Sequence, residues 1–145
     1  MDRIARMICN TQGKIFEKYA QQMSPTKFEN FVTFYMNSDF CAREMDSSYS
    51  WLHLQPALQS MDFIDMEIEK KKLVFSIESV KARMNTDVAW WLGFTYRHLA
   101  MKTNLASREI VQKVPVERLI LNYLGLHNED DDDVIGIICK NFHLL

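Results

Sequence analysis

Apolar residues recur every three or four positions along most of this chain, a spacing typical of amphipathic helices. The pattern predicts helices over residues 2–22, 25–37, 39–46, 56–69, 86–103, 108–113, 116–124 and 129–141. Residues with good N-capping side chains precede four of them, namely Ser24, Ser38, Ser107 and Asn128. Pro115 separates two of the predicted helices, because proline disfavours a helical residue before it and starts a helix well.

One segment does not follow this pattern. Residues 73–77 (Leu-Val-Phe-Ser-Ile) have a composition that favours a short strand. The sequence offers no obvious partner strand, and an isolated strand is unstable. A helix or an extended connector therefore fits these residues equally well.

Residues 87–101 form the most apolar of the predicted helices and include Trp90 and Trp91. Seven apolar or small residues follow one another from Val88 to Phe94. Neighbouring helical residues point about 100° apart, so such a run cannot lie on one face. We expect this helix to be covered on most sides and to form the centre of the fold.

The composition agrees with a helical protein. Only four glycines and three prolines occur in 145 residues, too few for the frequent turns of an all-β fold. The length suits one domain with its own core. We predict an all-α, single-domain orthogonal bundle of six to eight helices around the aromatic helix, spanning residues 1–145.

Charge and motifs argue against several classes of function. A net charge of −2 gives no general attraction to nucleic acid or to anionic lipid. The three cysteines and four histidines lack metal-ligand spacing, and no nucleophile motif or glycine-rich phosphate loop occurs. We expect no cofactor, no metal site and no enzymatic activity. No secretory signal or membrane-spanning run is recognisable, so we expect a cytoplasmic protein.

Five consecutive acidic residues form the first candidate binding site. These residues, together with the preceding histidine, are His127, Glu129, Asp130, Asp131, Asp132 and Asp133. Carboxylates in the first turn of a helix complement its dipole, which is the purely structural explanation. Five adjacent charges exceed what capping requires and repel one another. The run therefore indicates a surface for a basic protein partner.

Arg97 and His98 form a second candidate, a buried polar site within the aromatic helix. A buried arginine requires a carboxylate or carbonyl partner, or an aromatic ring on which to stack. The sequence favours that structural role over ligand binding.

Residues 105–123 resemble the first half of a helix-turn-helix. Pro115 replaces the usual glycine of the turn, and only Arg118 and Asn122 could read DNA from the second helix. The local charge of this segment is too low for binding driven by phosphate contacts. Two packed helices explain the segment better.

Residues 34–47, 87–97 and 115–127 together resemble a small, poorly characterised protein family of gut Firmicutes. The resemblance covers about residues 26–141 and implies a position beside genes for ADP-ribosyltransferase-like toxins. It implies an antitoxin-like or immunity-like role, and it carries over no catalytic or binding residue.

We therefore expect a non-enzymatic protein-interaction module, the antitoxin-like partner of an ADP-ribosyltransferase-like toxin. It would mask the toxin sterically, with residues 129–133 facing a basic nucleotide-binding cleft. Two alternatives remain open: a DNA-binding regulator that uses residues 105–123, and a small-ligand-binding protein or enzyme with a pocket at Arg97 and His98. The sequence does not indicate an oligomeric state.

Overall fold

The computed structural model describes residues 1–75 and 82–144, and all regular elements within them are helical. They are α1 (Arg3–Ala20), α2 (Pro25–Asn37), the π-helical turn η1 (Cys41–Met45), the 3-10 turn η2 (Trp51–Leu54), α3 (Ala57–Lys70), α4 (Thr86–Thr103), α5 (Ser107–Lys113), α6 (Val116–Leu121), α7 (Tyr123–Leu126) and α8 (Asp131–Asn141). The predicted all-α class is confirmed. Residues 73–75 form no strand, and 76–77, the rest of the ambiguous segment, lie outside the described residues.

Local signals located some helix ends correctly and misplaced others. Ser24 caps α2 as predicted, by accepting a hydrogen bond from the Lys27 N–H at 3.3 Å. Ser107 is not a cap but the first residue of α5, because its side chain bonds elsewhere. Asp130, rather than Asn128, caps α8.

Two shorter elements also differ from the prediction. The helix expected over residues 116–124 is interrupted at Asn122, which divides it into α6 and α7. The short helix expected over 39–46 is wound mainly as the π-helical turn η1, although Ser38 does accept the Cys41 N–H at 3.0 Å. The 3-10 turn η2 was not predicted.

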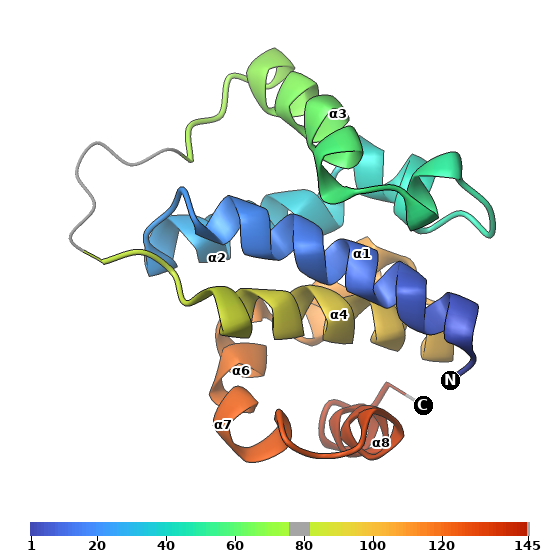
Figure 1. Ribbon diagram of the computed structural model, residues 1–145. Helices are drawn as coiled ribbons and strands as arrows, with labels where there is room; N and C mark the ends of the chain where they lie inside the picture. The colour runs from blue at the N-terminus through green and yellow to red at the C-terminus, as the bar shows by residue number, and fades with distance from the viewer. Residues whose placement is uncertain (76–81, 145) are drawn as a thin grey trace.

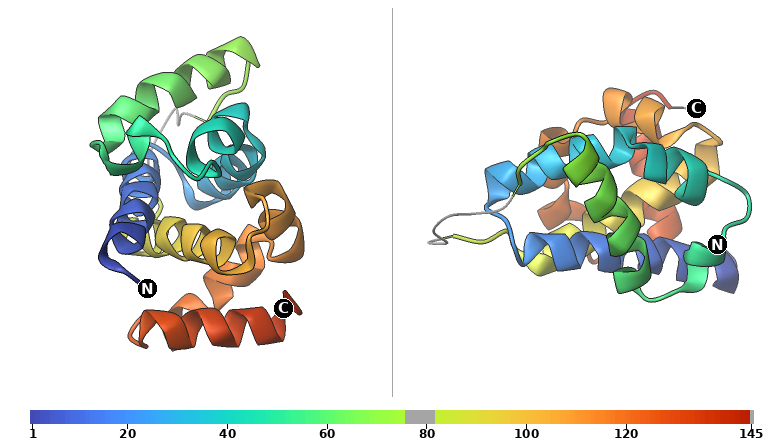
Figure 2. Two further views of the ribbon diagram at one scale, coloured as in Figure 1. Left: turned by 90° about the vertical axis from the view of Figure 1, so that its right-hand side faces the viewer. Right: turned by 90° about the horizontal axis from the view of Figure 1, so that it is seen from above.

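Helix α4 occupies the centre of the molecule, as its apolar sequence predicts. All residues from 91 to 100 are buried. Helix α1 lies alongside α4 and separates it from α3, while α6, α7 and α8 cover the opposite side (Figures 1 and 2). Helix α8 packs against α4, and its buried apolar residues complete the core on that side.

The closest approach between α1 and α4 depends on two glycines. A Cβ atom on Gly93 would lie 2.6 Å from the carbonyl oxygen of Gln12, and one on Gly13 would lie 2.7 Å from the Trp90 indole nitrogen. Neither position leaves room for a side chain. The backbones of α1 and α4 therefore touch, which fixes where the aromatic side chains of α4 emerge.

Helix α3 is tied to the α2–η1 junction by one carboxylate. Glu67 accepts the backbone N–H groups of Asp39 at 2.9 Å and Phe40 at 2.8 Å, and it pairs with Lys71 at 2.6 Å. Burial alone would raise the pKa of Glu67, but the Lys71 ammonium and the two N–H groups lower it below its ordinary value.

Among the described residues, no helix has both the length and the apolar character needed to cross a membrane.

Candidate functional site

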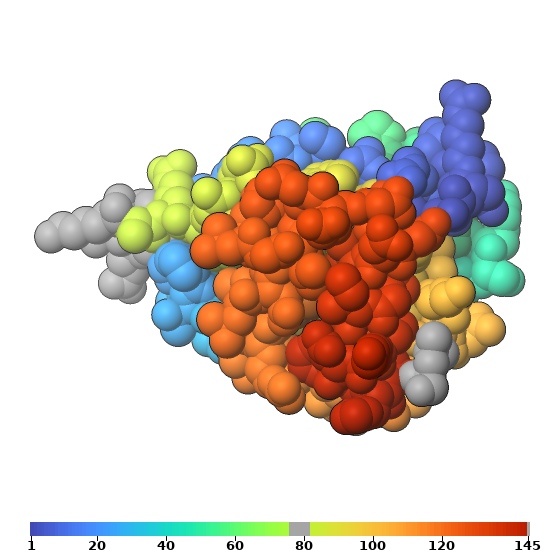
Figure 3. All heavy atoms as spheres, turned by 90° about the horizontal axis from the view of Figure 1, so that it is seen from below, coloured from blue at the N-terminus to red at the C-terminus, as the bar shows by residue number. Residues whose placement is uncertain are grey.

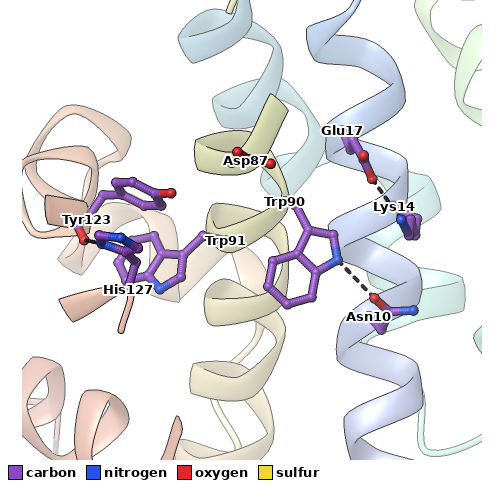
Figure 4. Close-up of a pocket in the computed structure, with 8 residues that line it drawn as sticks. All are labelled: Asn10, Lys14, Glu17, Asp87, Trp90, Trp91, Tyr123 and His127. Carbon is purple, nitrogen blue, oxygen red and sulfur yellow. Dashed lines mark hydrogen bonds and ion pairs between the residues drawn. The ribbon is translucent and has the colours of Figure 1, made fainter. Parts of the chain in front are cut away.

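A surface groove of about 390 Å³ opens beside the first turns of α4 (Figure 4). It is lined by Asn10, Lys14 and Glu17 from α1, by Asp87, Trp90 and Trp91 from α4, and by Tyr123 and His127 at the two ends of α7. We call these eight residues the aromatic groove. It joins segments from three distant parts of the chain.

The two adjacent tryptophans diverge because neighbouring helical side chains point about 100° apart. Trp90 points toward α1, where its indole N–H donates to the side-chain oxygen of Asn10 at 2.9 Å. Trp91 points toward α7, and its ring meets Tyr123 edge-on at a centroid distance of 5.6 Å. His127 stacks on Tyr123 at 4.3 Å. Both edges of the groove are therefore aromatic.

Acidic side chains give the groove its charge. Asp87 lies three and four residues before the tryptophans, a spacing that places it on their side of α4 (Figure 4). It is exposed to solvent. Lys14, the lysine of the groove, pairs with Glu17 at 3.1 Å. The charges of this pair cancel, so the carboxylate of Asp87 gives the groove a net negative charge.

The acidic run begins where the groove ends. A second cavity, of about 50 Å³, shares Trp90, Trp91 and His127 with the aromatic groove and adds Glu129 and Asp131 to its lining. His127 and the acidic run, predicted from sequence as one surface, therefore lie beside the exposed side of the aromatic helix.

Part of the acidic run is used inside the molecule. Asp130 caps α8, and Asp131 forms an ion pair with Arg6 of α1. Asp132 lies 3.5 Å from the N-terminal ammonium and 3.7 Å from Nε2 of His98. These contacts join the start of α1 to the start of α8, which are neighbours on the molecular surface (Figure 3).

The other two acidic side chains point outward. Glu129 and Asp133 are exposed, and their side chains make no hydrogen bond or ion pair with the rest of the described chain. They are the members of the run that are most available to a partner.

Arg97 lies in the core, and each nitrogen of its guanidinium donates a hydrogen bond to a neighbouring side chain. Nη1 donates to Asp46 at 2.8 Å, Nη2 donates to Ser107 at 2.9 Å, and both Nε and Nη2 donate to the side-chain oxygen of Gln12. Ser107 also donates its hydroxyl and its backbone N–H to Asp46. Burial opposes the charge of Arg97, but neighbouring Cys41, Tyr35 and Asp46 raise its pKa above the ordinary value.

Arg97 and His98 face different cavities. Arg97 borders a hollow of about 460 Å³ near Asp46 and His53, whereas His98 lines the small cavity next to the acidic run. Burial lowers the pKa of His98, and the nearby carboxylates of Asp132 and Asp131 partly oppose that shift. The structure therefore does not bring the two side chains into one pocket.

The cysteines lie in the interior as free thiols. Burial raises the pKa of Cys9 to about 12 and also raises those of Cys41 and Cys139. A thiol held protonated is a poor nucleophile. Within residues 1–75 and 82–144, no three histidine, cysteine or acidic side chains cluster as metal ligands would.

The polar side chains of the helix-turn-helix candidate make contacts within the chain. The guanidinium of Arg118 lies 4.7 Å from the centre of the Phe142 ring, and Asn122 donates to the carbonyl oxygen of Arg118 at 2.9 Å.

The geometry thus defines an all-α helical protein with a negatively charged aromatic groove. No protein family, curated protein sequence or solved structure matches this chain. A functional interpretation therefore has to rest on the chemistry of the groove and of the surface around it.

The sequence named the acidic run and His127 but missed the groove beside them. Asp87 carried a local signal, since it lies one helical turn before two tryptophans. Asn10 carried none, because 80 residues separate it from Trp90. Nor did any local pattern identify Gln12, Asp46 and Ser107 as the partners of Arg97.

Proposed function

We propose that this chain is a protein-interaction module of the antitoxin type, which binds a basic partner protein and masks it. The supporting observation is the continuity of the aromatic groove with the acidic run. Aromatic rings supply apolar contact area, and carboxylates attract a basic surface and set its orientation.

Exposed apolar residues near the groove support binding of a protein. Leu121 is 82% exposed and Leu124 is 85% exposed, and they flank Tyr123 in the α6–α7 segment. Two such leucines on one short segment offer apolar area for a protein partner to cover. The partner we propose is the ADP-ribosyltransferase-like toxin that the family resemblance implies, with its basic nucleotide-binding cleft facing residues 129–133.

Co-expression with that toxin tests the proposal. The unaltered chain should relieve growth arrest and co-purify with the toxin. A variant with Glu129→Gln, Asp130→Asn and Asp133→Asn should do so less well, and the difference in binding from the unaltered chain should shrink as ionic strength rises, because salt screens the attraction that the variant lacks. The matched control is the triple variant of Asp62→Asn, Glu69→Gln and Glu109→Gln, which also removes three exposed carboxylates.

The control variant should relieve the growth arrest caused by the toxin as well as the unaltered chain does. No complex and no relief of toxicity would overturn the proposed function. An equal loss of toxin binding in both triple variants would show that the net charge of the protein, rather than this surface, governs binding. Asp130 also caps α8, so the melting temperature of each variant is measured alongside.

A further inference from the structure

The aromatic groove combines ring faces with a carboxylate, which is the arrangement that attracts an organic cation. The face of an indole or phenol ring carries negative electrostatic potential, and tryptophan binds cations best. Trp90 is partly exposed, and Asp87 lies one turn before it on the same side of α4. A cation against Trp90 would therefore meet both a ring and a formal negative charge.

The neighbouring charges leave this position open to a cation. Lys14 is held by Glu17 at 3.1 Å, and Arg6, at the far end of the surface, is held by Asp131. His127 donates its Nδ1–H to the Tyr123 carbonyl oxygen at 2.8 Å, since that oxygen can only accept. Among the residues that the structure describes, none places an unpaired lysine or arginine beside Asp87, so an anion would meet the Asp87 carboxylate without compensation and this part of the groove disfavours it.

We propose that the aromatic groove receives an arginine side chain of the partner protein, with its guanidinium against Trp90 and hydrogen-bonded to Asp87. A guanidinium is planar, stacks on rings, is weakly hydrated and matches a carboxylate with two N–H groups, whereas an ammonium is a strongly hydrated point charge. The groove is open on its outer side, which suits a side chain presented by another surface. This inference rests on the proposed function, because the arginine belongs to the partner.

The test uses the protein alone with short peptides as probes. The probes are acetyl-Gly-Ser-Arg-Ser-Gly-amide and the same peptide with citrulline, which is nearly isosteric but uncharged. The readout is the set of indole N–H signals in a nitrogen-15 NMR titration. Trp51 is an internal control, because it lies on η2, outside the groove, and is 52% exposed.

The arginine peptide should shift the Trp90 signal in a saturable way and leave Trp51 unchanged. Citrulline should bind at least about threefold more weakly, and Asp87→Asn should weaken arginine binding to a similar extent. Trp90→Leu should weaken it about tenfold. Because Trp90 packs against Gly13 and can affect folding, Asp87→Asn is the decisive variant, with Asp62→Asn on α3 as its control.

Equal binding of the two peptides, an unchanged affinity in Asp87→Asn, or shifts at Trp51 as large as those at Trp90 would overturn the arginine site. A free arginine derivative that binds as tightly as the toxin would instead assign the groove to a small ligand and equally overturn it. Relief of toxicity without a groove response would reject this inference and leave the proposed function standing. A groove response to arginine without relief of toxicity would reject the toxin as the partner.

Discussion

Arg97 shows why a buried charge need not mark a binding site. It is 2% exposed, and its guanidinium contacts residues from α1, α5 and the end of η1. Each contact replaces a hydrogen bond that water would otherwise supply. The cluster thereby holds three separate segments of the chain against α4.

Removal of the carboxylate partner should be severely destabilising. Asp46→Ala leaves Arg97 as an uncompensated buried charge, which costs about 3–5 kcal/mol of unfolding free energy. Urea denaturation measures the loss. Asp62→Ala, on the exposed face of α3, should change stability by less than about 0.5 kcal/mol. The double variant Asp46→Ala with Arg97→Met should recover part of the lost unfolding free energy. A loss of less than about 1 kcal/mol for Asp46→Ala alone would contradict the role given to this pair.

Local sequence could identify Arg97 as a residue in need of partners but could not name them. Asp46 lies 51 residues away, Ser107 lies ten residues away, and Gln12 lies 85 residues away. Ser107 even misled the prediction, because a serine before an apolar run fits a helix cap. In the fold its hydroxyl bonds Asp46 instead. Ser24 was predicted correctly because its cap depends on residues within one turn.

At the level of elements, the contact between α1 and α4 positions the groove. Gly13 and Gly93 allow the two backbones to meet, and the meeting point sets how far Trp90 projects beside Asn10. Periodicity predicted α1 and α4 but not their crossing. Nothing in the spacing of either helix indicated that two isolated glycines, 80 residues apart, would face each other.

A methyl group at that crossing should force the helices apart. Gly93→Ala should destabilise the protein by about 1–3 kcal/mol, since the new Cβ would lie 2.6 Å from backbone. Gly136→Ala is the matched control in α8, where a Cβ meets nothing within 4 Å. That change should stabilise by about 0.5–1 kcal/mol, because alanine loses less entropy than glycine in a helix. Thermal unfolding distinguishes the two, and equal effects would refute the tight crossing.

The attachment of α3 through Glu67 should depend on pH. The pKa of Glu67 is lowered in the folded state from an ordinary value of 4.5, so its contribution is complete above that value. The contribution is lost as the pH falls through the lower folded pKa. Glu67→Gln should therefore lower the melting temperature at pH 7, and the two proteins should converge once the pH falls below the lowered pKa of Glu67. Glu69→Gln, exposed on the same helix, should show no such dependence.

At the scale of the whole molecule, the acidic run has two roles that its sequence did not separate. Asp131 and Asp132 join α8 to the start of α1, while Glu129 and Asp133 remain directed to solvent. Composition alone predicted a charged surface. The division between internal and outward carboxylates depends on how α8 crosses α4, which only the assembled fold determines.

This division predicts how α8 is held. Asp131→Asn combined with Asp132→Asn removes the pairs with Arg6, the N-terminal ammonium and His98 but keeps the Asp130 cap. Exposed ion pairs are worth about 0–1 kcal/mol each. Amide exchange over residues 134–141 should therefore rise severalfold, whereas the buried amides of α1 should keep their protection.

Salt provides the internal check on that prediction. High ionic strength screens exposed pairs, so it should accelerate exchange in α8 of the unaltered protein and have little effect on the double variant. Asp133→Asn, which removes a carboxylate that lacks a described ion pair, should leave exchange in α8 unchanged. If the double variant instead exchanged like the unaltered protein, the apolar residues of α8, Val134, Ile135 and Ile138, would suffice to hold it. Asp131 and Asp132 would then belong, with Glu129, to the surface available for a partner.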